Sequence, residues 1–64
     1  MGKEVRETIE GPRSELVASL RDRAEGWDHL GKVDWSREAY AALERLEAGA
    51  DDVQAGRTRY VVTG

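Results

Sequence analysis

The chain has to hold its fold together without a disulfide bond, because its 64 residues contain no cysteine. A chain of this length buries only about 60% of the surface that it exposes when unfolded, so a single core is marginally stable. Small domains commonly add disulfides, a structural metal or a partner chain. Thiolate zinc sites are excluded, and a single histidine, His29, excludes a cluster of imidazole ligands within one chain. The sequence therefore favours oligomerisation over a lone minimal core.

Core material is also scarce. Hydrophobic residues make up 39% of the chain and charged residues 36%, with no phenylalanine and a single isoleucine, Ile9. No apolar run approaches the roughly 18 residues that a membrane span requires. The opening "MGKEVRETIEG" lacks the apolar region of a secretory signal. We expect a cytoplasmic protein that does not contact membranes.

The first half of the chain predicts a strand and a helix. Residues 3–10 alternate loosely and contain several β-branched side chains, which favours an extended segment, although the spacing of the two apolar residues also fits a helix. Gly11-Pro12 interrupts this pattern. Apolar residues then recur at helical spacing and predict a helix over residues 13–30. Pro12 is suited to its first position or Ser14 to its N-cap, and Gly31 is a typical stop signal.

The second helix has the clearest signal. An apolar stripe with helical spacing predicts an amphipathic helix over about residues 35–48. Asp34 is expected as its N-cap, with Ser36 as the alternative, and Gly49 as its end. The stripe consists of Trp35, Ala39, Leu43, Leu46 and Ala50.

The last residues predict a short turn and a strand. Asp51 is placed to cap one extra helical turn over residues 51–55, which Gly56 would end. The segment "RTRYVVT", residues 57–63, then reads as a strand. Alternation predicts one side with Tyr60 and Val62 and an opposite side with Arg59, Val61 and Thr63.

These elements predict a single α+β domain over residues 1–64, ordered strand-helix-helix-strand. Two amphipathic helices pack on a small sheet that dimerisation completes. Residues 57–64 are expected either as the edge strand of the chain's own sheet or as a partner-binding segment. The net charge of −3 is uneven, since residues 34–52 hold six acids and two bases while the tail holds only bases. Such asymmetry favours contact between the tail and an acidic face of another chain.

No residue pattern points to catalysis, a metal or a cofactor. Asp28 and His29 are adjacent, and neighbouring side chains on a helix point about 100° apart, so they do not form a relay by themselves. The later carboxylates lack the spacing of a calcium loop and predict a solvated acidic face; they are Glu44, Glu47, Asp51 and Asp52. We therefore expect a protein that is not an enzyme.

Two tryptophans, Trp27 and Trp35, bracket the connection between the helices. Core packing is their ordinary role, because each supplies a large buried area to a chain that lacks bulk. The alternative is an exposed binding platform.

A strand followed by two helices is also the outline of a ribbon-helix-helix dimer, whose paired strands enter the major groove of DNA. Here the outward side of the first strand would carry Glu4, Arg6, Thr8 and Glu10. Two acids on that side oppose binding to phosphates. The start of the second helix is the one favourable feature, since backbone amides and a basic side chain bind phosphate. The candidate DNA-binding residues are Arg6, Thr8, Ser36 and Arg37.

The stretch "ALERLEAGADDVQAGR", residues 42–57, resembles the C-terminal half of small bacterial antitoxins from type II toxin–antitoxin pairs. Many of these end in an acidic amphipathic helix, a similar turn and a short tail. The resemblance implies a toxin-binding role for Leu43, Leu46, Val53, Arg57, Tyr60 and Val61. Arg59 joins this set because the tail arginines suit carboxylates of a partner.

The sequence thus predicts a small, dimeric, non-enzymatic protein-binding module that is antitoxin-like or inhibitor-like. It would bind a partner protein, such as a toxin, through the second helix and the basic C-terminal strand. The alternative is a DNA-binding regulator of the ribbon-helix-helix type.

Overall fold

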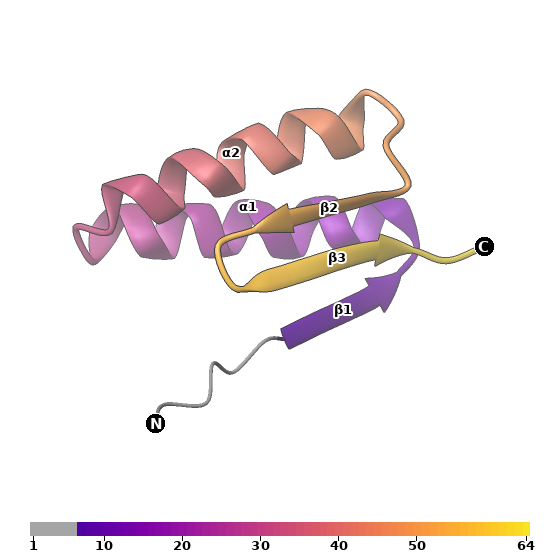
Figure 1. Ribbon diagram of the computed structural model, residues 1–64, viewed down its shortest axis with the longest axis horizontal. Helices are drawn as coiled ribbons and strands as arrows, with labels where there is room; N and C mark the ends of the chain where they lie inside the picture. Colours follow the sequence, from indigo (N-terminus) through magenta and orange to yellow (C-terminus); the bar gives the residue numbers. More distant parts are fainter. Residues whose placement is uncertain (1–6) are drawn as a thin grey trace.

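The computed structural model describes residues 7–64, which form a three-stranded sheet with both helices packed on one face (Figure 1). This confirms the predicted α+β class and the order of the first elements. The elements are β1 (Glu7–Gly11), α1 (Arg13–His29), α2 (Val33–Glu47), β2 (Asp52–Ala55) and β3 (Thr58–Val62).

The sheet has the order β1-β3-β2, so the C-terminal strand lies in its centre. β1 pairs with β3 in parallel, and β2 pairs with β3 antiparallel. The prediction that the tail is an edge strand is therefore wrong. The two helices carry the chain across the sheet between β1 and β2, and this leaves the central position for the last strand.

The segment 51–55 is also different from the prediction, because Asp52–Ala55 forms β2 instead of a helical turn. Its side chains alternate between exposed and buried, with Val53 and Ala55 buried under the helices. Gly56 has a φ of 60°, a left-handed conformation that favours glycine and makes the tight turn into β3. Pairing with β3 satisfies the backbone of this short segment.

Both helices end near the predicted residues but begin with other caps. Pro12 stands at the N-cap of α1, without a side-chain cap, so Ser14 does not have this role. α2 begins two residues earlier than expected, with Lys32 at its N-cap and Asp34 inside the first turn. The predicted alternative cap, Ser36, is buried and donates a hydrogen bond of 3.2 Å to the Ala24 carbonyl of α1. It therefore joins the two helices.

One long-range contact closes the far end of α2. The Arg13 guanidinium donates hydrogen bonds of 2.7 Å to the carbonyl oxygens of Leu46 and Ala50. The two carbonyls lie in the last turn of α2 and just beyond its end, where the helix dipole favours a cation. Arg13 thus caps α2 from the first turn of α1.

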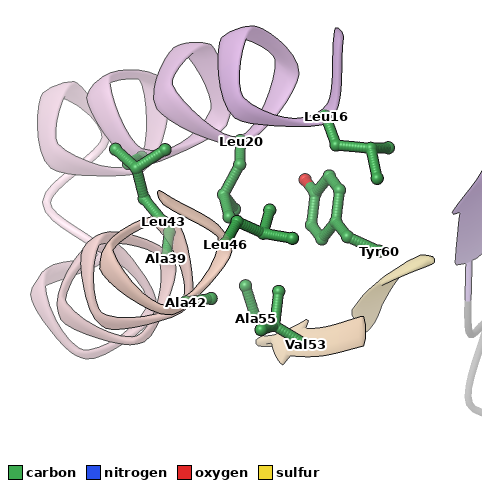
Figure 2. Close-up of a cluster of buried hydrophobic side chains, with 10 residues drawn as sticks. Leu16, Leu20, Ala39, Ala42, Leu43, Leu46, Val53, Ala55 and Tyr60 are labelled. Carbon is green, nitrogen blue, oxygen red and sulfur yellow. The ribbon is translucent and has the colours of Figure 1, made fainter. Parts of the chain in front are cut away.

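The core lies between the helices and the covered face of the sheet (Figure 2). The ring of Tyr60 is surrounded by Leu16 and Leu20 of α1 and Leu46 of α2. Tyr60 has the largest fully buried side chain among the described residues. The Tyr60 oxygen points toward α1. A tyrosine therefore supplies the bulk that the chain lacks in phenylalanine.

Candidate protein-binding surface

Four of the seven predicted partner-binding residues belong to the core of the chain itself. Leu43, Leu46, Val53 and Tyr60 are all less than 7% exposed. A partner cannot reach them while the domain is folded, so this part of the prediction is corrected. The apolar stripe that indicated a contact surface on α2 faces the chain's own sheet.

The other three residues are accessible but do not form one cluster. Arg57 lies in the turn between β2 and β3, with its guanidinium carbon 5.7 Å from the centre of a Trp35 ring. Arg59 and Val61 lie on the face of the sheet that the helices leave uncovered, as the alternation predicted. There the Arg59 Nη2 atom is 2.6 Å from an Asp52 carboxylate oxygen.

The candidate DNA-binding residues are scattered as well. Arg6 lies outside the described residues, and Ser36 is buried. Thr8 is exposed on β1, and Arg37 is exposed on α2, in the other layer. β1 pairs with β3 of the same chain, whereas the ribbon strand of a ribbon-helix-helix protein pairs with a second copy. DNA binding as such stays a prediction.

The structure instead forms a groove between α2 and the outer edge of β2, which we call the α2–β2 groove. Small side chains on α2 make room for it beside the strand. Its lining residues are Glu38, Ala41, Ala42, Arg45, Gln54 and Gly56. The sequence reasoning missed all six, because it read α2 only for its apolar stripe and residues 51–55 as a turn.

One end of the α2–β2 groove is held by a hydrogen bond from the hairpin turn to α2. The Gly56 N–H donates to a Glu38 carboxylate oxygen at 3.0 Å. A side chain at Gly56 would meet the Trp27 ring at 3.5 Å. The turn is therefore packed against both helices, which fixes the strand edge relative to α2.

The outer edge of β2 carries free main-chain groups. The Val62 N–H donates to the Asp51 carbonyl at 2.7 Å, and this bond sets the phase of the antiparallel ladder. In such a ladder alternate residues bond to the neighbouring strand, so Val53 and Ala55 face β3. The N–H and C=O groups of Asp52 and Gln54 therefore point away from β3, and Gln54 also lines the groove. No other strand among residues 7–64 pairs with this edge.

The two ends of the groove differ in charge. Arg45 lies seven residues after Glu38 on the same helix, two turns further along. The ion pairs found among residues 7–64 do not include Arg45. A second hollow shares Arg45 and Gln54 with the groove, and Arg59 also lines it. The groove is thus basic near Arg45 and acidic near Glu38.

The tryptophans pack against each other at the joined end of the helices. Their ring centres are 5.6 Å apart and the ring planes meet at 74°, an edge-to-face arrangement. Both are half-buried, and Trp27 packs against the core. Lys32 and Arg57 lie over Trp35. Their main role is therefore to attach the hairpin turn to the helices.

Several acidic side chains engage in ion pairs within the chain. Asp51 lies 3.7 Å from Arg13, and Glu47 lies 3.8 Å from Arg21. Within the described part of the chain, no three histidine or carboxylate side chains gather closely enough to hold a metal ion. The same residues include no helix with the length and apolar character to cross a membrane.

Comparisons with protein-family models, with curated protein sequences and with solved structures find no match for this chain.

Proposed function

We propose that this chain is a small, non-enzymatic protein-binding module. An extended segment of the partner adds to the free edge of β2 as a further strand and lies in the α2–β2 groove. The observation that carries this proposal is the outward main chain of Asp52 and Gln54 on the edge strand, of which Gln54 lines that groove. Main-chain hydrogen bonds supply the affinity in this mode of recognition, and side-chain pockets supply the specificity.

The shape of the groove supports a peptide as the occupant. Ala41 and Ala42 leave space next to the strand edge, where larger side chains would close it. The turn at Gly56 is held in place by Glu38 and Trp27, so little of the binding energy is lost in ordering the site. The edge is short, and short edges limit unwanted pairing.

The resemblance to antitoxins covers the same part of the chain. Residues 42–57 contain four of the six groove residues, namely Ala42, Arg45, Gln54 and Gly56. An antitoxin-like or inhibitor-like role in the cytoplasm would therefore use α2 and the C-terminal hairpin, as the sequence predicts, but through the groove instead of the apolar stripe.

The charges of the groove suggest which segment fits. A partner segment with an acidic side chain near Arg45 and a neutral or basic side chain near Glu38 would match the charges at the two ends of the groove. A peptide with an acid at the Glu38 end meets a like charge that already holds the hairpin turn. Direction along the edge is thereby specified by charge.

Selection from a phage-displayed library of random dodecapeptides tests the proposal. The Gln54→Pro variant removes the outward N–H from the β2 edge without removing a bond to β3. Thr8→Pro, the same change on an outward residue of the opposite edge strand, is the matched control. We expect peptides that bind the wild type and the Thr8→Pro variant and lose at least about tenfold in affinity for Gln54→Pro.

The binding site is then located by NMR chemical-shift changes of the full chain with a selected peptide. Changes concentrated on α2 and β2 support the proposal. A library that yields no binder, or a binder whose shift changes lie away from both elements, refutes it.

A further inference from the structure

Among residues 7–64, the sheet has a second unpaired edge, on β1. The Glu7 N–H donates to the Arg57 carbonyl at 3.1 Å, and the Thr63 N–H donates to the Gly11 carbonyl at 3.0 Å. These bonds fix the phase of the parallel ladder, in which Glu7, Ile9 and Gly11 bond to β3. The main-chain groups of Thr8 and Glu10 therefore point outward, where no strand among residues 7–64 pairs with them.

We propose that two copies of the chain pair antiparallel through β1, with a twofold axis at Ile9. The three strands of each copy then join into one continuous sheet with all helices on one face. β1 and β2 lie at opposite edges of the sheet (Figure 1), so this pairing leaves the α2–β2 groove open. The inference is independent of the proposed function.

The sequence of β1 suits this register. Thr8 stands opposite Glu10 of the second copy, and each such pair exchanges both of its N–H···O bonds. Glu7 stands opposite Gly11 of the second copy, so no acid faces an acid. Ile9 meets its own equivalent on the covered side of the sheet. Shifting the register by two residues so that Glu10 stands opposite Glu10 of the second copy places two acids against each other.

Ile9 gives this edge its apolar contact. It packs against the core but is only partly buried, at the open side of the sheet. A second copy would cover the exposed part of its side chain with another isoleucine. Directly opposed residues of antiparallel strands have Cβ atoms roughly 4.5–5.5 Å apart, so the two isoleucines would be in contact.

A stripe on α1 is complementary to itself about the same axis. Its charged ends, Glu15 and Arg23, stand eight residues apart on α1, and each lies next to β1. The Arg23 Nη2 atom is 3.0 Å from a Glu7 carboxylate oxygen, and a Glu15 carboxylate oxygen is 3.3 Å from where a Gly11 side chain would begin. α1 therefore runs antiparallel to β1.

The twofold axis at Ile9 consequently lies between the Arg23 and Glu15 contacts along the strand. Glu15 of one copy then faces Arg23 of the other, and the opposite pair forms by symmetry. The outward main-chain groups of β1 and the charges on α1 are both self-complementary about the same twofold axis. This agreement is the main reason to expect a second copy as the occupant. The self-complementarity is that of an isologous interface.

Sedimentation velocity of the full chain, from micromolar to near-millimolar concentration, tests this inference. We expect reversible exchange between a species of 7.1 kDa and a dimer, because the contact is small compared with stable interfaces. Thr8→Pro removes an outward donor from each copy and should weaken dimerisation more than about tenfold. Gln54→Pro, on the far edge, should leave dimerisation unchanged.

A second variant is needed in case Thr8→Pro disturbs folding, which far-UV circular dichroism reports. Glu15→Arg changes an exposed side chain, places it against Arg23 of the second copy, and should weaken dimerisation by about threefold to tenfold at low salt. A monomer at every concentration overturns the inference. The inference is also overturned if either variant, Thr8→Pro or Glu15→Arg, is folded and dimerises as strongly as the wild type.

Discussion

The Tyr60 hydroxyl gives the sharpest stability test. The residue is fully buried, and its oxygen has no hydrogen-bond partner among the described residues. Burial raises the pKa of Tyr60 from its ordinary value of 10.0, while the charge of Arg23 opposes the rise, Glu7 adds to it and the nearby Ser19 side chain lowers it. An unsatisfied buried hydroxyl costs about 1–3 kcal/mol.

Tyr60→Phe removes this hydroxyl and keeps the ring that fills the core. We expect a gain of about 1 kcal/mol in the free energy of unfolding, at the low end of the range because Ser19 lies close enough to interact. For a domain of this size, 1 kcal/mol raises Tm by about 4–8 °C. Thermal and urea denaturation followed by circular dichroism measures the change. Tyr40→Phe is the matched control, since Tyr40 is exposed.

The same hydroxyl gives the pH dependence a definite sign. The folded-state pKa lies above the unfolded value of 10.0, so the folded chain holds the proton where the unfolded chain releases it. The contribution of Tyr60 is thus fully present below pH 10 and is lost as the pH rises through the folded-state pKa. Above pH 10, the stability advantage of Tyr60→Phe over the wild type should therefore increase. A variant less stable than the wild type at pH 7 would show that the hydroxyl has a favourable partner in solution and would refute the reasoning.

Three further substitutions test single contacts at the end of α2, in the hairpin turn and between β2 and β3, each by urea denaturation. Arg13→Ala should cost about 1.5 kcal/mol, because it removes charge-assisted hydrogen bonds from the end of α2; an unchanged midpoint would show that water replaces them at no cost. Gly56→Ala should cost about 1–2 kcal/mol, because it places a side chain at a φ of 60°, and a neutral result would mean that the turn relaxes. Arg59→Ala should cost less than about 1 kcal/mol, since its ion pair with Asp52 is exposed; a larger loss would indicate that Arg59 stabilises β3 in another way.

Local sequence patterns were sufficient where an element carries its own signal. The stripe of α2 and the glycine after each helix place both helices to within about two residues, because helical periodicity and C-terminal stop signals are properties of short segments. The alternation from Arg59 to Val62 likewise assigns the two faces of β3. These patterns also identify which side chains are apolar together, but not what covers them.

The location of the candidate site was decided by the tertiary structure. Leu43, Leu46 and Tyr60 read equally well as a contact surface for a partner or for the chain's own sheet, because burial depends on what packs against a face. Residues 51–55 became a strand because β3 pairs with them, a contact that local propensity does not encode. Only that pairing creates the free edge beside α2.

By itself, the sequence determined that this is a small α+β domain with two helices, a glycine turn and a β-forming tail, since spacing and turn chemistry act within a few residues. The tertiary structure alone decided that the tail is the central strand, that the apolar stripe is core, and that two strand edges stay unpaired among residues 7–64. Those features depend on hydrogen bonds and packing between residues far apart in the chain, such as Arg13 with Ala50 and Glu38 with Gly56.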